Sequence, residues 1–129
     1  MARRASERPT EGELEILRVL WERDKATVRE VNDQLNQHRS TGYTTTLKLM
    51  QIMLDKGLLR RDESRRPQVY APTVSKLKVR GQFVGDLLER VFDGSTSQLV
   101  MQVLSSKDTT PENLSEIRRA LDEMEKERR

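Results

Sequence analysis

The stretch from Thr41 to Tyr70, TGYTTTLKLMQIMLDKGLLRRDESRRPQVY, decides the fold of this chain. It opens with hydroxyl-bearing residues, after which apolar residues recur at the three- and four-residue spacing of one helix face. These apolar residues are Leu47, Met50 and Leu54. We therefore expect a helix over residues 42–56 whose buried side carries them, with Ile52 or Met53 at the margins.

A β-hairpin is expected directly after this helix. Gly57 stands where a helix C-terminus favours a left-handed residue. Two strand-like runs follow, residues 58–62 and 68–71, joined by the sequence Glu63-Ser64-Arg65-Arg66. A helix followed by a hairpin with a basic tip is the arrangement of a winged-helix DNA reader, in which the hairpin is the wing.

Two helices are expected before the stretch, because two capping boxes mark their first turns. Thr10 is followed three residues later by Glu13, and Thr27 by Glu30, and each pair precedes an apolar run. Residues 1–9 read as a basic arm. The sequence thus predicts a mainly α-helical chain with a winged helix-turn-helix domain at residues 1–73, made of three helices and a small hairpin.

The candidate DNA contacts are hydroxyl, amide and cationic side chains on the third helix and the hairpin. Short polar side chains at the start of a recognition helix can bond base edges, and arginines on a wing can bond phosphates. The predicted contacts are Thr41, Tyr43, Thr44, Thr45, Thr46, Lys48, Gln51, Arg60, Arg65 and Arg66. The alternative is that the threonines and arginines merely face solvent.

Charge and composition agree with a nucleic-acid partner and exclude several other classes. Residues 39–70 hold seven basic and three acidic residues, a net charge of +4, so the positive excess of a chain whose formal net charge is +3 lies in this segment. There is no cysteine, and His38 is the only histidine, so we expect no metal site and no cofactor. No nucleophile or phosphate-loop motif is present, so we expect no enzyme. We also expect a cytoplasmic protein with no membrane insertion, because no apolar run exceeds three residues.

Residues 74–129 predict an α-helical dimerisation domain. Three amphipathic helices in so short a segment make a thin core, and a second copy of the chain would cover their apolar stripes. The predicted dimer contacts are Leu77, Val84, Leu87, Leu88, Val91, Leu99, Val103, Leu114, Ile117 and Leu121. The alternative is a self-contained three-helix bundle.

The chain resembles the penicillinase (β-lactamase) repressor family, of BlaI/MecI type, over nearly its whole length. The resemblance lies in PTEGELEIL (9–17), ATVREV (26–31), GYTTTLKLM (42–50) and RPQVY (66–70). It implies a homodimeric winged-helix repressor that occupies a palindromic operator in double-stranded DNA.

Two branches of that family carry distinct regulatory sequence motifs. In the β-lactam branch, a sensor-protease system leads to cleavage at an Asn-Phe bond in the dimerisation domain. Gln102 and Val103 occupy that position here, so the cleavage motif is absent. The copper-responsive branch ends in a cysteine cluster, which this chain lacks.

Two other functions remain as alternatives from the sequence. A ligand-sensing winged-helix regulator of another type would require a sizeable apolar pocket between its reading and dimer domains. A helical protein-interaction adaptor would tolerate changes on the surface of the third helix without loss of DNA binding.

Overall fold

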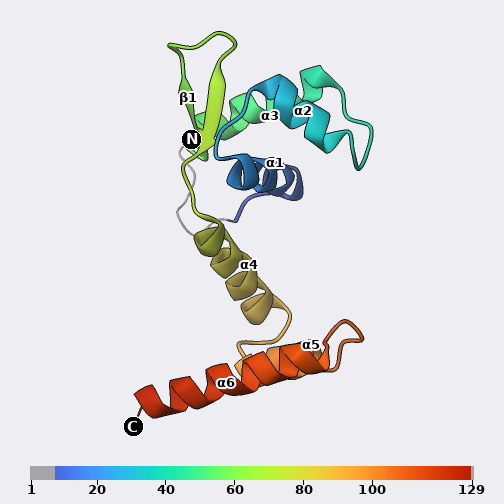
Figure 1. Ribbon diagram of the computed structural model, residues 1–129, viewed down its shortest axis with the longest axis vertical. Coiled ribbons are helices and arrows are strands. Elements are labelled where there is room, and N and C mark those ends of the chain that lie inside the picture. Colours follow the sequence, from blue (N-terminus) through green and yellow to red (C-terminus); the bar gives the residue numbers. More distant parts are fainter. Residues whose placement is uncertain (1–7, 129) are drawn as a thin grey trace. The chain divides into compact units, whose positions relative to one another are not determined.

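The computed structural model describes residues 8–128, and most of the predicted basic arm (residues 1–7) and residue 129 lie outside the described residues. The elements in chain order are α1 (Glu11–Arg23), α2 (Val28–Leu35), α3 (Tyr43–Asp55), β1 (Leu59–Asp62), β2 (Val69–Pro72), α4 (Lys76–Arg90), α5 (Thr96–Leu104) and α6 (Pro111–Glu127) (Figure 1). Three helices followed by a two-stranded hairpin and further helices confirm the predicted fold class.

Both predicted capping boxes are formed. The Thr10 hydroxyl accepts from the Glu13 amide at 3.2 Å, and the Thr27 hydroxyl accepts from the Glu30 amide at 3.1 Å. Each glutamate in turn accepts from the backbone N–H of its threonine at 2.9 Å. The bond from the Thr27 N–H is the main cause that lowers the pKa of the Glu30 carboxyl. Local sequence alone therefore sets where α1 and α2 begin.

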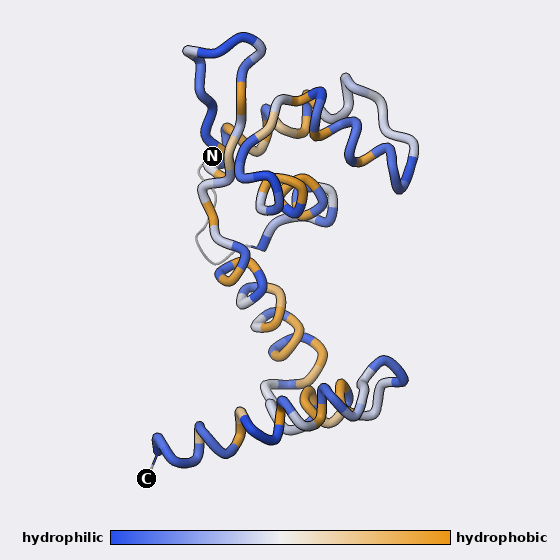
Figure 2. Tube along the Cα trace, in the orientation of Figure 1, coloured by the Kyte–Doolittle hydropathy of each residue, from blue (hydrophilic) through white to orange (hydrophobic). Residues whose placement is uncertain are grey.

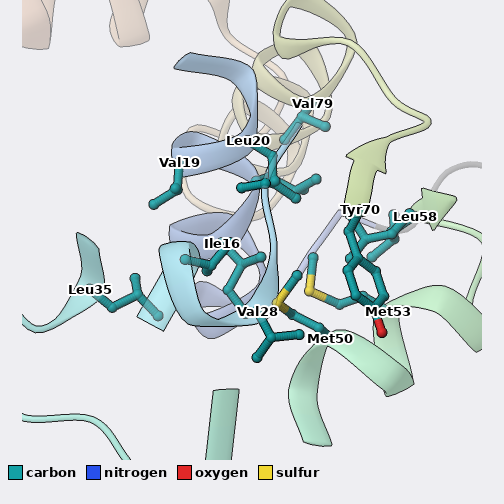
Figure 3. Packing of buried hydrophobic residues seen from close by; sticks show 14 residues of the cluster. Ile16, Val19, Leu20, Val28, Leu35, Met50, Met53, Leu58, Tyr70 and Val79 are labelled. Carbon is teal, nitrogen blue, oxygen red and sulfur yellow. The ribbon is translucent and has the colours of Figure 1, made fainter. Parts of the chain in front are cut away.

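The core of the first three helices is aliphatic and fully closed (Figure 3). Ile16, Leu17 and Leu20 of α1 have no exposed surface, and neither have Met50 and Met53 of α3. Burying each such side chain contributes about 1.5–3 kcal/mol. This cluster holds the three helices together.

The buried stripe of α3 is rotated from the one expected. Thr46, Met50 and Met53 are buried, whereas Leu47 and Leu54 are only partly buried against the core. The expectation of Met53 at the margin was wrong because both stripes have helical spacing and α3 has apolar residues on more than one side. Packing contacts with α1 and α2 decide which of the two stripes of α3 is buried.

An ion pair between a buried carboxylate and a partly exposed ammonium joins the start of α1 to the end of α3. The Glu13 side chain is 1% exposed, and its Oε2 accepts a hydrogen bond from the Lys56 Nζ at 2.7 Å. A carboxylate withdrawn from water is costly unless it is paired. The same residue that closes the capping box of α1 therefore also fixes the position of the α3 C-terminus.

The hairpin is anchored to the helices at its base. Its strands pair antiparallel from Leu59 opposite Pro72 to Asp62 opposite Val69, within one residue of the predicted bounds. Tyr70 also exchanges two backbone hydrogen bonds, of 2.8 and 3.0 Å, with Ala26 in the loop between α1 and α2. A two-stranded ribbon is marginal alone, so these bonds and the buried Tyr70 ring make the wing part of the domain.

The chain divides into two compact units, Met1–Val84 and Gly85–Arg129, so that the division falls within α4. In the first unit, Val79 of α4 is buried in the core, and the Trp21 indole N–H donates to the Val74 carbonyl at 2.9 Å. These contacts assign the first turns of α4 to the winged-helix unit. The predicted boundary between a DNA-binding domain and a dimerisation domain, at residues 73 and 74, remains a prediction.

The second unit contains α5 and α6, and local signals again set their starts. The Ser95 hydroxyl caps α5, and Thr110 caps α6 with Pro111 at the first helical position. Thr110 and Asn113 form a third capping box, which the sequence analysis did not identify. None of the residues of α5 and α6 is buried.

Among the described residues, none of the helices combines the length and the apolar character needed to cross a membrane.

Candidate nucleic-acid interface

The exposed side of α3 gathers five of the ten predicted DNA contacts. These five exposed residues are Tyr43, Thr44, Thr45, Lys48 and Gln51. Gly42 at the N-cap supplies no side-chain hydrogen bond, and the first turn holds no acidic residue. The first amides of α3 are therefore free of side-chain caps, and this end of the helix is a favourable place for a phosphate.

Two of the predicted contacts face the protein interior instead. Thr46 is 1% exposed, and its hydroxyl lies 2.7 Å from the side-chain amide group of Asn32 in α2. The Thr41 hydroxyl oxygen is also buried, and the Thr41 backbone is bonded by the Asn36 side chain. We therefore correct the prediction and remove Thr46 and the Thr41 hydroxyl from the candidate contacts.

Arg29 is a candidate contact that the sequence analysis missed. Its guanidinium lies over the Tyr43 ring, 4.5 Å from the ring centroid, so that α2 and α3 present one joint surface. A cation in the first turn of a helix is opposed by the helix dipole. Arg29 is the second residue of α2, and a cation at this unfavourable position is the sequence signal that could have marked it as a candidate DNA contact.

The turn of the hairpin is held by its own polar groups. The Asp62 carboxylate accepts from both the hydroxyl and the amide of Ser64, and these bonds lower the pKa of Asp62. The Arg66 guanidinium donates to the backbone oxygens of Glu63 and Arg65, at 2.8 and 3.1 Å. Arg66 therefore has a structural role in shaping the tip.

The other three arginines of the hairpin differ in how far they are engaged. Arg61 is bound to the Glu63 carboxylate at 2.6 Å, and this contact, with Tyr70, raises the pKa of Arg61. Arg60 and Arg65 form no ion pair with any carboxylate in residues 8–128. The tip is hydrophilic almost throughout (Figure 2). Arg60 and Arg65 are thus the wing cations whose guanidinium groups are least engaged, and the exposed Arg66 remains a predicted contact because its two bonds to backbone oxygens leave its charge unpaired.

The apolar residues predicted for the dimer face are largely uncovered in the single chain. Leu77 is 81% exposed, Val91 63% and Leu121 52%. Val84, Leu87, Val103 and Leu114 are also exposed, while Leu88, Leu99 and Ile117 are intermediate. Figure 2 shows hydrophobic stretches recurring along α4, α5 and α6. A self-contained bundle would bury such residues, and the described helices α5 and α6 contain no buried side chain.

A hollow of about 600 Å³ lies in the first unit, beside α1, the end of α2 and the start of α4. Its lining consists of Glu15, Arg18, Val19, Trp21, Glu22, Gln34, Leu35, His38 and Lys76. Most of these residues are charged or polar, and Glu15 is already bonded by Arg39 at 3.0 Å. The hollow lies within the first unit, so it is not the pocket between reading and dimer domains that a ligand-sensing regulator would require. Within residues 8–128, no group of three His, Cys, Asp or Glu is arranged to hold a metal ion.

Comparison with known proteins gives a consistent family. The family model described as penicillinase repressor matches residues 9–123. The chain is 22% identical to the penicillinase repressor of Bacillus licheniformis over 114 residues, which cover 88% of this chain and 89% of that protein. It is 28% identical to the transcriptional regulator BlaI of Mycobacterium tuberculosis over 117 residues, which cover 88% and 84% of the two chains.

A third relative is the methicillin resistance regulatory protein MecI of Mammaliicoccus sciuri, 18% identical over 109 residues that cover 84% of this chain and 89% of that protein. The matched residues include the three helices, the hairpin and most of α6. The chain, with its three-helix unit, basic hairpin and uncovered C-terminal helices, belongs to the penicillinase repressor family.

Proposed function

We propose that the chain is a sequence-specific transcriptional repressor that binds a palindromic operator as a homodimer. The observation that carries the proposal is the exposed face of α3, where hydroxyl, amide and ammonium groups meet an uncapped helix N-terminus. The relatives named as repressors and regulators support repression as the outcome of binding. The family is one of transcriptional regulators and not of enzymes.

The chemistry of this face suits the major groove. Thr44, Thr45 and Gln51 can donate to and accept from base edges, and Lys48 can bond the acceptors of a guanine. Tyr43 with Arg29 above it lies at the same end of the helix, where a phosphate would approach. In the proposed complex, α3 enters the groove and the wing places Arg60 and Arg65 near the flanking backbone.

The homodimer is supported by the energetics of the second unit. Ordering a residue costs about 1–2 kcal/mol of backbone entropy, which folded domains offset by apolar burial. The helices α5 and α6 bury no side chain in the single chain, yet they expose Val100, Met101, Val103, Leu114 and Leu121. A second copy with the same stripes would supply the missing burial and pair two reading units on one duplex.

Repression in this proposal is steric. A dimer that lies across a promoter in the cytoplasm keeps polymerase from the same DNA. The proposal assigns no induction by cleavage at Gln102–Val103, because these exposed residues at the end of α5 are not an Asn-Phe pair. A sensor or protease of an inducing pathway would have to act elsewhere on the chain.

The proposal can be tested by fluorescence anisotropy with two labelled duplexes. One covers the region upstream of the gene that encodes the chain, and the other is a shuffled duplex of equal length and composition. We expect the upstream duplex to bind at least about 1,000-fold more tightly, as specific sites do. Equal binding of both duplexes would refute sequence-specific recognition. A role as a protein-interaction adaptor would then be the better interpretation.

The wing makes a separate prediction about salt. Replacing Arg60 and Arg65 with alanine should weaken binding to both duplexes and lower the slope of log affinity against log salt concentration by about 4, because each half of the dimer loses two phosphate contacts and each contact contributes about 1. The matched control is Arg118→Ala with Arg119→Ala, which removes two exposed arginines from α6. A slope unchanged in the wing variant, or lowered equally in the control, would show that the wing does not touch the backbone.

A further inference from the structure

A small polar cluster joins α2 to the first turn of α3. The Asn36 side chain is its centre: the amide nitrogen donates to the backbone oxygens of Asn32 and Thr41, both at 2.8 Å. The Asn36 side-chain oxygen accepts from the Thr41 amide at 3.0 Å. One side chain thus bonds both backbone polar groups of the residue that leads into α3.

Asn32 forms the second half of the cluster from within the core. It is 6% exposed, and its amide group lies 2.7 Å from the Thr46 hydroxyl. With its nitrogen turned toward α3, Asn32 also donates to the oxygens of Thr41 and Gly42 at 3.1 and 3.2 Å and accepts from Asn36 at 3.2 Å. That orientation satisfies more neighbours, because backbone oxygens can only accept.

Apolar packing alone does not orient this end of α3. Met50 and Met53, the fully buried apolar residues of α3, lie in its second half. In the first turn, Tyr43 is 38% exposed and Thr44 and Thr45 are exposed. The exposed Arg29 guanidinium also contacts the Tyr43 ring. Among the described residues, the hydrogen bonds that reach the start of α3 from α2 and its C-cap are those of Asn32 with Thr46 and of Asn36 with Thr41.

We propose that Asn32 and Asn36 are positioning residues for DNA reading, a role that rests on the function proposed above. They form a clasp, defined as Asn32, Asn36, Thr41 and Thr46, that fixes the direction in which the first turn of α3 leaves α2. The side chains of Thr44, Thr45 and Lys48 depend on that direction, because a base-reading hydrogen bond tolerates only a small change of distance and angle. The clasp itself touches no base.

The test compares Asn36→Ala with Gln37→Ala in the full-length protein. Both residues are exposed amides in the same loop, but within residues 8–128 the Gln37 side chain is bonded by Gln34 alone, at 3.4 Å. Anisotropy with the upstream and shuffled duplexes gives the ratio of the two affinities. We expect Asn36→Ala to lose about tenfold or more in affinity for the upstream duplex, because base reading is impaired in both halves of the dimer, and less than about twofold for the shuffled one, since phosphate contacts remain. Gln37→Ala should match the parent on both.

Amide hydrogen exchange in the free protein provides a readout that needs no DNA. The Thr41 amide should exchange about tenfold faster or more in Asn36→Ala, because its bond to the Asn36 oxygen is lost. A second variant, Thr46→Val, keeps the volume at the buried position and removes the hydroxyl that meets Asn32. Thr46→Val should also lower the ratio of the affinities for the upstream and shuffled duplexes. If circular dichroism shows that Asn36→Ala is unfolded, the result with Thr46→Val tests the clasp instead.

The outcomes separate the clasp from the proposed function. A folded Asn36→Ala with the parent's ratio of affinities and the parent's exchange rate at Thr41 would overturn the clasp. An equal loss on both duplexes would also overturn it, because misdirected reading spares non-specific binding. If the parent protein bound both duplexes equally, the proposed function would be overturned, and with it the role of Asn32 and Asn36 in DNA reading. Faster exchange of the Thr41 amide in Asn36→Ala would then still show that the clasp orders the turn before α3.

Discussion

Replacing Leu114 and Leu121 with aspartate is expected to leave the protein monomeric and to weaken its binding to the upstream duplex by about 100-fold or more. Both side chains are exposed on α6, 42% and 52%, and lie on the same apolar stripe. An aspartate in a dimer interface would be an unpaired charge out of water, whose cost the dimer could not offset. Analytical ultracentrifugation and anisotropy on the same samples measure the two effects.

The size of the loss follows from effective concentration. When one half of a dimer is bound, the other half is held near the second half-site, and this tethering can raise affinity by a factor of about 10² to 10⁴. A monomer loses that factor although each α3 is unchanged. Binding of the monomer to the shuffled duplex should therefore fall as well.

Ser115→Asp is the matched control for this prediction. It places the same charge on the same helix, on the side away from Leu114 and Leu121, at a position that is exposed. The control should remain dimeric with the parent's affinity. A double variant that stays dimeric, or a monomer that binds like the parent, would contradict the role assigned to the second unit.

Thr45→Ala and Lys48→Ala should each cost about 1–3 kcal/mol in binding to the upstream duplex if the side chain reads a base. Both side chains are exposed on α3 and neither is part of the core, so the free energy of unfolding should change little. The loss on the shuffled duplex should be smaller for Thr45→Ala. Lys48→Ala would lose affinity on both duplexes if its ammonium meets a phosphate instead.

Lys107→Ala is the control for the lysine, since it removes an exposed ammonium from the loop between α5 and α6. Anisotropy over a range of salt concentrations separates base reading from phosphate binding, because only the latter lowers the salt slope. If Thr45→Ala and Lys48→Ala both bound the upstream duplex like the parent, α3 would not be the reading helix. The wing and the start of α2 would then be the next candidates.

The starts of the helices and the position of the hairpin follow from short-range sequence. Thr10 with Glu13 and Thr27 with Glu30 cap their own helices, and Gly57 adopts φ 81° at the end of α3, where a side chain would be strained. Each of these signals acts over at most four residues. For that reason the three helices and the hairpin could be predicted within one or two residues.

The interior face of α3 could not be predicted in the same way. Leu47, Met50, Met53 and Leu54 permit two adjacent stripes, and burial of Thr46 becomes favourable only because Asn32 of α2 offers a hydrogen bond there. The expected contact at Thr46 was corrected for this reason. A partner 14 residues away along the chain is invisible to helical periodicity.

The sequence by itself determined the order of helices and hairpin, the basic segment and the apolar stripes of the C-terminal helices, because caps, periodicity and charge are properties of neighbouring residues. Only the tertiary structure decided which threonines of α3 face outward, that Arg29 lies over Tyr43, and that Asn36 bonds both polar groups of the Thr41 backbone. Those features depend on distances between separate helices, which packing sets and local sequence does not.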